Sequence, residues 1–303
     1  MNKIVVAGLV NVETTVKINS FPIEYSPINF PFFGIQSQAS GVGLNLGKAL
    51  VTLGDEVKLL SMIGKDSAGV IVKKSLTDCG IDTSYIAENI SATSQSVVLY
   101  DENGKRQIYC DLKEIQDCSY DEEVFKEVIK ESSIVCLCNI NFSRNLLKIA
   151  KDNGKIIATD VQVLGDIHDS YNADYMKSAH ILFLSNENIK EPVEEFVKSI
   201  AKEYDNEIIV VGLGSEGALL YVKKDNCIKK IQAVKTREVV NTIGAGDSLF
   251  SCFIHYYSID GDPYEAIKKA MVFASYKIGV ESAADGFLKE DELERLYITY
   301  KKA

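Results

Sequence analysis

The sequence predicts an α/β fold, a doubly wound and mostly parallel sheet with a small β-sheet lid. Short runs of β-branched residues alternate with longer helical patterns over most of the 303 residues, as in sheets whose helices cover both faces. Glycines follow several helical patterns, where helix C-caps favour them. Two segments depart from this alternation and carry the turn and proline signals of a separate antiparallel sheet.

The strands expected in the main sheet are apolar runs, typical of parallel strands that are buried on both faces. They are Ile4–Ala7, Val57–Ile63, Ile134–Cys138, Ile156–Thr159, Ile181–Leu184 and Ile208–Val211. The expected helices each end just before a glycine, at Gly54, Gly80 and Gly154. They are Asn45–Leu53, Ala68–Cys79 and Ser143–Asn153. This order of elements predicts helices on both faces of one sheet.

The two exceptional segments predict the lid, which we place at about 12–40 and 93–112. Thr93–Tyr100 and Arg106–Asp111 alternate in polarity around the turn Asp101–Gly104, which is the pattern of a β-hairpin. The first segment has strand-like residues at Thr14–Ile18 and then carries three of the chain's five prolines. We expect both segments to form a small sheet that covers a site beside the main sheet.

Composition and charge exclude several classes of protein. The chain is 46% hydrophobic and 25% charged, which is typical of globular proteins. Its net charge of -10 repels a nucleic-acid backbone, and no apolar run approaches the ~18 residues of a membrane span. Without an internal repeat or linker, residues 1–303 are expected to form one domain. Seven scattered cysteines without a secretory signal indicate reduced thiols in the cytoplasm, and neither they nor the histidines suggest a metal site.

The segment Gly212–Gly217 reads G-x-G-x-x-G directly after an expected strand, as in the dinucleotide-binding fingerprint. That fingerprint needs a helix to open at its third glycine, so that the helix dipole meets a pyrophosphate. Here Ala218–Val222 continues as a strand pattern instead. We therefore expect a glycine turn between antiparallel strands, which a nucleotide can still contact.

The segment Ser40–Lys48 ends in Gly-Lys, as phosphate-binding loops do. A Walker loop would need glycine at Val42 and serine or threonine at Ala49, so the spacing excludes one. What remains is a flexible loop that opens a helix, with Asn45 near the first turn. An amide both donates and accepts hydrogen bonds, so Asn45 either caps the helix or recognises a polyhydroxyl ligand.

The stretch Val239–Ser248 is the most informative part of the chain. It precedes an apolar stripe at helical spacing, formed by Phe250, Phe253, Ile254 and Tyr257. At the start of this helix, Gly244, Ala245 and Gly246 leave backbone N–H groups open to an anion. A carboxylate beside a polyphosphate costs electrostatic energy, so Asp247 needs an explanation. It is either a general base for an attacking hydroxyl or a stabiliser of the first helical turn.

The segment Asn241–Asp247 resembles the D-T-x-G-A-G-D signature of the ribokinase-like carbohydrate kinases, the phosphofructokinase-B type. Four other segments resemble that family in the same order. They are Gly8–Glu13 (its opening strand and substrate-contacting tip), Ser40–Asn45 (its G-G-x-x-x-N element), Met62–Gly69 (its G-x-D-x-x-G segment) and Val211–Gly217 (its nucleotide loop). The agreement extends from Lys3 to about Gly286. The family fold, an α/β core with a β-sheet lid, is the one that the element pattern predicts independently.

The resemblance implies a kinase that uses ATP and magnesium to phosphorylate a hydroxyl of a sugar-like substrate. It implies Asp247 as the base and Gly244, Ala245 and Gly246 as the anion hole. The substrate-binding residues that it implies are Asn11, Glu13, Gly41, Gly43, Asn45 and Asn139. Those near the nucleotide are Asn186, Gly214, Gly217 and Thr242. Magnesium binds largely through phosphates and water, with Glu187 or Glu191 in indirect contact. Lids of this family often pair, so a homodimer through the lid is expected.

Several positions depart from the family pattern. Glu13 stands where most members have aspartate, Val42 where ribokinase has lysine and Asn139 where ribokinase has glutamate. Ile189 stands where the family's N-x-x-E element ends in glutamate. Asn241 replaces an aspartate that helps a monovalent-cation site in several members, which leaves open whether this chain needs such a cation. Because the base and the anion hole are intact, we expect activity to be retained.

The sequence therefore predicts an ATP-dependent carbohydrate kinase, with two alternatives. Asn139 favours a nucleoside kinase of the pseudouridine kinase type. Ile189, in place of glutamate, favours a non-catalytic sugar or nucleotide sensor, although the intact Asp247 argues against it. With Val42 and Asn139 the pocket loses two charged contacts, so we expect an acceptor that is larger or more apolar than ribose. Aromatic residues near the lid either stack on a nucleobase or pack in the lid core; they are Phe21, Tyr25, Phe30, Phe32 and Phe33.

Overall fold

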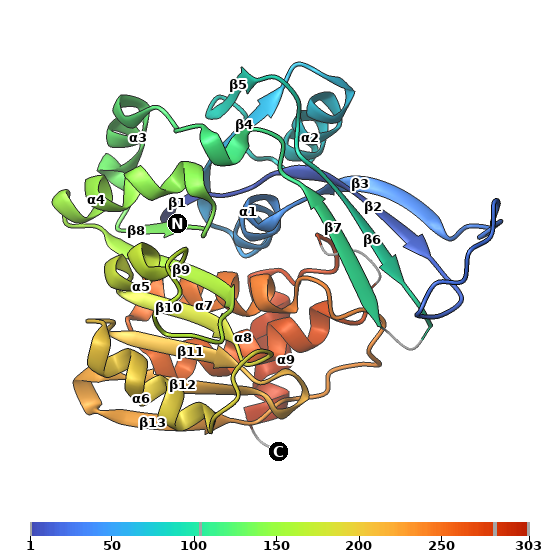
Figure 1. The fold of residues 1–303 in the computed structure, drawn as a ribbon. Coiled ribbons are helices and arrows are strands. Elements are labelled where there is room, and N and C mark those ends of the chain that lie inside the picture. Colours follow the sequence, from blue (N-terminus) through green and yellow to red (C-terminus); the bar gives the residue numbers. More distant parts are fainter. Residues whose placement is uncertain (1, 103–104, 281–283, 302–303) are drawn as a thin grey trace.

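The computed structural model describes residues 2–102, 105–280 and 284–301 (Figure 1). Their main sheet has nine strands in the order β13-β12-β11-β10-β9-β8-β1-β4-β5. The strands are β1 (Lys3–Ala7), β4 (Glu56–Gly64), β5 (Ile86–Ile90), β8 (Ile134–Leu137), β9 (Ile156–Val163), β10 (Ile181–Ser185), β11 (Ile208–Gly212), β12 (Ala218–Val222) and β13 (Cys227–Ile231). All pairs from β11 to β5 are parallel, and β12 and β13 are antiparallel. The predicted doubly wound, mostly parallel sheet is confirmed.

Each predicted strand forms close to its expected bounds, because its apolar residues are buried on both sides of the sheet. In β8, for example, all four residues are buried. Strand β9 differs most, since it continues to Val163 rather than ending at Thr159. Its pairing with β10 shifts register, and Gln162 has a positive φ of 60°. This irregularity lies in the part of β9 beyond the predicted apolar run, where a bulge bends the strand and leaves a residue unpaired.

Helices cover both faces of the main sheet (Figure 1). They are α1 (Val42–Thr52), α2 (Ser67–Asp78), α3 (Glu122–Val128), α4 (Arg144–Asp152), α5 (Ala173–Ser178), α6 (Val193–Glu203), α7 (Ala245–Asp260), α8 (Pro263–Lys277) and α9 (Glu290–Lys301). The three helices predicted to end before a glycine are α1, α2 and α4. Gly54, Gly80 and Gly154 follow them with φ of 99°, 75° and 65°, the left-handed conformation of a helix C-cap.

A second sheet of four strands, in the order β3-β2-β6-β7, forms the predicted lid and projects from the main body (Figure 1). Its strands are β2 (Asn11–Lys17), β3 (Ile35–Ser40), β6 (Gln95–Tyr100) and β7 (Arg106–Asp111). Strands β6 and β7 pair antiparallel, which confirms the hairpin. Asn103 and Gly104 of its predicted turn lie outside the described residues.

The segment between β2 and β3 carries the aromatic residues for which sequence allowed two interpretations. The interpretation that these residues pack in the lid core is wrong for four of the five. The side chains of Tyr25, Phe30, Phe32 and Phe33 are exposed by 93%, 74%, 85% and 101%. Apolar side chains gain their stabilisation from burial, so these four contribute little to the lid itself.

The chain passes from the main sheet into the lid at the carboxyl end of β1, where α1 also begins. The Gly43 N–H donates to Leu9 O at 2.9 Å. A Cβ on Gly43 would lie 2.7 Å from Gly8 O, so only glycine permits this approach. The start of the lid and the start of α1 are thereby held at the edge of the sheet where ligands bind in open α/β folds.

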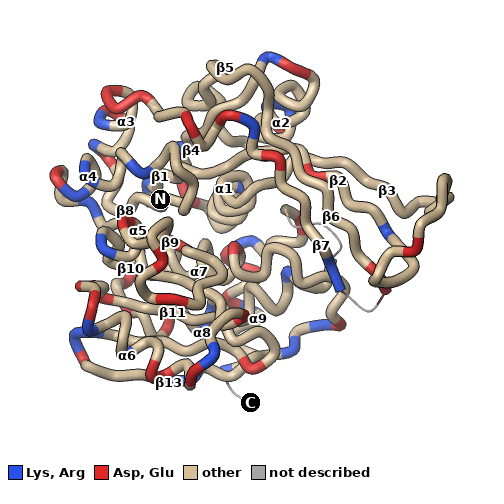
Figure 2. The backbone as a smooth tube through the Cα atoms, viewed as in Figure 1, with Lys and Arg blue, Asp and Glu red and all other residues tan. Residues whose placement is uncertain are grey.

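Charged residues of both signs lie around the outer helices, and the segment between β2 and β3 is almost free of them (Figure 2). Among the residues that the structure describes, no helix is long and apolar enough to cross a membrane.

Candidate active site

The N-terminus of α7 forms an open anion-binding loop. Gly244 precedes the helix with φ 77°, a left-handed conformation that glycine adopts without strain. The Ala245 N–H turns back to Thr242 O at 3.2 Å. The next N–H groups belong to the first turn, which has no intrahelical acceptor and lies at the positive end of the helix dipole. Around a Cβ on Gly246, the nearest atom would be Asp160 Oδ2 at 3.9 Å. The arrangement has room for a phosphoryl group.

Asp247 lies in the first turn of α7, and Asn45 of α1 donates from Nδ2 to its Oδ2 at 2.7 Å. The capping interpretation of Asn45 is wrong, because Gly41 is the N-cap of α1 and no side chain caps that helix. Burial raises the pKa of Asp247, while the hydrogen bond from Asn45 and the charge of Lys277 oppose the rise. A carboxylate with a raised pKa is better suited to accept a proton from a hydroxyl.

Strand β2 contributes Asn11 and Glu13, which lie on the same face because side chains alternate along a strand. Asn11 Nδ2 donates to Ser96 Oγ at 3.0 Å. Glu13 is 9% exposed and shares a hydrogen bond with the Ser40 side chain. Burial raises the pKa of Glu13, and the negative charge of Asp247 adds to the rise. This effect of the Asp247 charge on Glu13 indicates that the lid carboxylate and the Asp247 carboxylate lie near each other.

Two amide oxygens in this site have no hydrogen-bond partner in residues 2–102, 105–280 and 284–301. They are Asn11 Oδ1 and Asn45 Oδ1, and both are buried. An unsatisfied buried acceptor costs about 1–3 kcal/mol. Hydroxyl groups of a substrate are the donors that would satisfy both, so the site fits a polyhydroxyl ligand.

Gly41 and Gly43 allow the start of α1 to pack closely against the segment that leads from β1 into the lid. Gly41 has φ 103°, and a Cβ there would lie 2.5 Å from Leu9 O. A Cβ on Gly43 would lie 2.7 Å from Gly8 O. Both glycines therefore leave the floor of the site without side chains, which brings backbone rather than side chain near a ligand.

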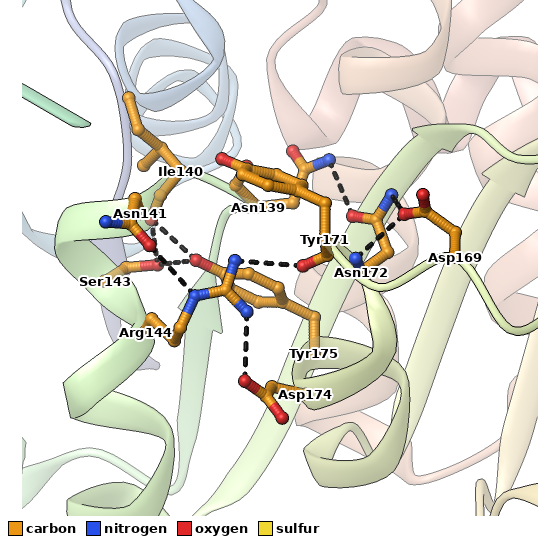
Figure 3. A network of polar contacts seen from close by, with 10 residues as sticks. All are labelled: Asn139, Ile140, Asn141, Ser143, Arg144, Asp169, Tyr171, Asn172, Asp174 and Tyr175. Atoms are coloured by element: carbon orange, nitrogen blue, oxygen red, sulfur yellow. Dashed lines mark hydrogen bonds and ion pairs between the residues drawn. The ribbon is translucent and has the colours of Figure 1, made fainter.

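Asn139 follows β8 and belongs to a network of polar contacts (Figure 3). Its Nδ2 donates to Val161 O at 3.3 Å and to Asn172 Oδ1 at 3.2 Å, while Tyr171 Oη donates to Asn139 O at 3.0 Å. Asn172 in turn donates to Asp169 Oδ2 at 2.9 Å. Both amide protons of Asn139 are thus engaged within the protein, and its Oδ1 is the group left to meet a ligand.

Arg144 supports the same network from α4 (Figure 3). Its guanidinium donates to Asn141 Oδ1 at 2.9 Å, Asp174 Oδ2 at 3.1 Å and Tyr171 O at 2.9 Å. The guanidinium also lies 5.0 Å from the ring centre of Tyr171, a cation–π distance. The rigid fork of one arginine therefore fixes the loop that holds Asn139 in place.

The predicted glycine turn is confirmed, because β11 and β12 pair antiparallel on either side of it. Gly214 and Gly217 have φ of 58° and 104°, and a Cβ on Gly217 would lie 2.0 Å from Ile231 O. The Asn186 N–H donates to Gly212 O at 3.1 Å. The end of β10 and this turn are therefore adjacent, as a shared nucleotide contact requires.

Glu187 and Glu191 are exposed. No group of three or more His, Cys, Asp or Glu side chains within the described ranges is arranged to hold a metal ion.

Comparison with known proteins identifies the family. A family model described as pfkB family carbohydrate kinase matches residues 1–290. The chain belongs to this family. The kinase is 24% identical to a ribokinase of Dictyostelium discoideum, over 96% of this chain and 99% of the relative.

Solved structures resemble the kinase along its whole length. A microbiome-derived acarbose kinase is 25% identical, with a TM-score of 0.88 over 98% of this chain and 99% of that one. The ribokinase of Arabidopsis thaliana, solved with ribose and ATP, is 20% identical, with a TM-score of 0.81 over 98% of each chain. The chain is an ATP-dependent carbohydrate kinase, and kinases of this family use ATP and Mg²⁺.

Sequence reasoning missed Asp160 in this kinase. Its Oδ1 accepts the N–H of Gln162 at 2.7 Å at the irregularity in β9, and its Oδ2 faces Gly246. Burial raises the pKa of Asp160 to about 7, and the charge of Asp247 adds to the rise. A polar residue directly after the apolar run Ile156–Thr159 was the available signal, because the carboxyl ends of parallel strands carry ligand-binding residues.

Lys277 is the second residue that was missed. It is fully buried at the end of α8, and its Nζ donates to Ile243 O just before the anion-binding loop. Burial lowers the pKa of Lys277 to about 8, against the opposing charges of Asp247, Asp285 and Glu13. The available signal was its place in the apolar stripe of α8, at helical spacing from Ala270 and Ala274.

Replacing Asp160 by asparagine should change how stability depends on pH. Because the pKa is raised to about 7 in the folded state, the folded protein holds this proton more tightly than the unfolded chain. The parent should therefore lose stability relative to Asp160→Asn as pH rises from about 4 to about 7, by roughly 1.4 kcal/mol per unit of pKa difference. Denaturant unfolding at several pH values measures this.

The matched control is Asp152→Asn, at an exposed position on α4, which should track the parent at every pH. The raised pKa would be contradicted if the difference in unfolding free energy between the parent and Asp160→Asn stayed constant between pH 4 and pH 8.

Proposed function

We propose that Asp247 is the general base for transfer of the γ-phosphoryl group of ATP to a hydroxyl of a sugar-like substrate other than free ribose. The observation that supports this most is the position of the Asp247 carboxylate. It is held by Asn45 at 2.7 Å, directly after the open N–H groups at the start of α7. Asp247 would thus accept the proton of the acceptor hydroxyl, and the neighbouring N–H groups of the same helix turn would stabilise the charge of the phosphoryl group.

Each residue has a distinct part in this proposal. The N–H groups of Gly244 and Gly246 stabilise negative charge on the transferred group, while that of Ala245 is bound to Thr242 O. Asn45 orients Asp247 and offers its Oδ1 to a second hydroxyl. Bound ATP supplies the phosphoryl group, and Mg²⁺ offsets the charge of its phosphates. Because Asp247 is partly buried, its proton transfer occurs away from bulk water.

The nucleotide site is proposed along the neighbouring strand ends. Asn186, Gly214, Gly217 and Thr242 would line it, with Glu187 or Glu191 reaching Mg²⁺ through water. The backbone adjacency of Asn186 and Gly212 supports this placement, since N–H groups near two strand ends can approach phosphates together. We also propose that the kinase acts in the cytoplasm, where its seven cysteines would stay reduced.

The acceptor is proposed from the groups that face the site. Asn11 and Asn45 offer oxygens to hydroxyl donors, and Glu13 offers a carboxylate one methylene longer than aspartate. Val42 and Asn139 bring no charge. A pocket with fewer charged anchors discriminates less in favour of a small polyhydroxyl ligand and accommodates a larger one. Family membership favours the enzyme over the non-catalytic sensor that the sequence left open.

A nucleoside acceptor is the second candidate. The exposure of Tyr25, Phe30, Phe32 and Phe33 leaves aromatic faces available to a nucleobase, which stacks on such rings. Asn139 Oδ1 would then accept from a base amide or a sugar hydroxyl.

A homodimer through the lid is also proposed. Monomeric proteins rarely expose large contiguous apolar patches, yet the lid strands expose Ile35, Val97 and Tyr109 by 57%, 38% and 53%. Val97 and Tyr109 are paired neighbours on β6 and β7, so they lie on the same face of the sheet. A second lid would cover them.

Asp247→Asn should cut turnover by ~10²-fold or more, the usual scale for a lost general base. ATP affinity, measured by calorimetry, should change little, because the amide keeps the shape of the side chain. Asp260→Asn, at the exposed far end of α7, is the control and should keep full turnover. Turnover of Asp247→Asn within threefold of the parent would show that Asp247 only stabilises the start of the helix.

Free ribose should be a poor substrate. ADP release against a broad panel of sugars and nucleosides should give ribose a kcat/KM at least ~10-fold below that of the best acceptor, because polar partners for a small sugar are missing. A panel in which ribose ranks first sinks this part of the proposal.

The double variant Val97→Glu/Tyr109→Glu should be monomeric at concentrations where the parent sediments as a dimer, because like charges would face each other across the lids. Val124→Glu, on α3 and 38% exposed like Val97, should remain dimeric. Sedimentation velocity distinguishes the two masses. A parent that sediments as a monomer refutes the lid dimer.

A further inference from the structure

Lys277 is a buried charge that the proposed mechanism does not use. It is 0% exposed, and no other lysine or arginine in the described part of the chain is buried. Burying an unpaired ammonium costs several kcal/mol, which fixed partners must offset. We therefore expect a specific role for a lysine that is buried at this cost beside the candidate active site.

The end of α8 holds the segment that leads into the anion-binding loop. Lys277 Nζ donates to Ile243 O. The next residue, Ile278, accepts the N–H groups of Val240 at 2.8 Å and Asn241 at 3.0 Å. Residues 240 to 243 are therefore fixed at both ends by two consecutive residues of one helix end.

The bond to Ile243 O has a direct consequence for the loop. The carbonyl of Ile243 and the N–H of Gly244 belong to the same planar trans peptide unit, so they point in opposite directions. A cation that holds this oxygen on one side directs the Gly244 N–H to the other side. That N–H belongs to the loop that would bind the phosphoryl group.

Burial lowers the pKa of Lys277, and the negative charges around it offset part of that effect. Asp247, Asp285 and Glu13 contribute negative charge, and Arg237 is the opposing positive group. The last turn of a helix is also the negative end of its dipole, which stabilises a cation. These groups come from α7, the segment after α8, the lid and the segment before α7, so the charge balance surrounds the ammonium.

We propose that Lys277 is a positioning residue whose ammonium serves as an internal cation beneath the anion-binding loop. It fixes the Ile243 carbonyl and the Gly244 N–H, and the kinase therefore works without a dissociable monovalent cation. This inference rests on the proposed function of that loop and of Asp247.

Three variants separate charge from packing. Lys277→Met keeps an apolar side chain of similar length and removes the charge. Lys277→Ala removes the charge and leaves a cavity beside Ile243 O and the nearby carboxylates, with space for a potassium ion. Lys268→Ala is the control, because Lys268 lies on the same helix and its side chain is 45% exposed.

The first measurement is the melting temperature in about 100 mM potassium chloride and in equal tetramethylammonium chloride, whose cation is too large for the cavity. An ion that binds only the folded protein raises the melting temperature, by more the further its concentration exceeds its dissociation constant. Lys277→Ala should melt higher in potassium than in tetramethylammonium, whereas the parent, Lys277→Met and Lys268→Ala should melt alike in both. Equal melting of Lys277→Ala in the two salts overturns the inference.

The second measurement is turnover in the same salts. The parent should have the same kcat in both, Lys277→Met should lose at least ~10-fold in kcat with KM for ATP within threefold, and potassium should restore part of the kcat of Lys277→Ala. A parent that needs potassium, or a Lys277→Met kcat within threefold of the parent, overturns the inference. Full turnover by Asp247→Asn, assayed alongside, refutes the general base instead, and the melting comparison still tests Lys277.

Discussion

The site depends on one hydrogen bond, from Asn45 to Asp247, between residues 202 positions apart in the chain. It joins the first turns of α1 and α7, which begin at the same edge of the main sheet. Because Gly41 and Gly43 have no side chains, the start of α1 can pack closely against the end of β1, and this contact fixes α1. The left-handed Gly244 allows α7 to begin with its N–H groups open. A shift of either helix would separate the carboxylate from the amide that orients it.

Three carboxyl groups surround this bond, and their mutual repulsion is the main electrostatic constraint on the site. Burial raises the pKa of Asp247, Glu13 and Asp160, and the charge of Asp247 adds to the rise at the other two. A site of this kind needs positive charge before it can bind a polyphosphate. The helix N-terminus and Mg²⁺ brought with the nucleotide would supply it in the proposed mechanism, and the ammonium of Lys277 would add to it. The same negative charges stabilise the ammonium of Lys277, so the groups depend on one another.

Features that depend on neighbouring residues could be predicted from the sequence. The apolar runs gave the parallel strands, the glycines gave helix ends and the β11–β12 turn, and Asp247 with its loop could be located from local pattern alone. Contacts between distant segments could not, because nothing in a single sequence states which strand ends meet. Asp160 directly precedes an irregularity in β9 that depends on pairing with β10. Lys277 matters only because its helix ends against Ile243. The exposure of Phe32 could not be predicted either, since aromatic residues near a small sheet are buried or exposed according to what packs against that sheet.

The central claim is that Asp247 accepts the proton of the hydroxyl that attacks the phosphoryl group at the start of α7. The most direct measurement is a crystal structure of the kinase with its best acceptor and a non-hydrolysable ATP analogue. We expect the acceptor hydroxyl within about 3.2 Å of an Asp247 carboxylate oxygen, with the terminal phosphate against the N–H groups of Gly244 and Gly246. An acceptor bound with every hydroxyl beyond reach of Asp247, or a terminal phosphate held elsewhere, would contradict it.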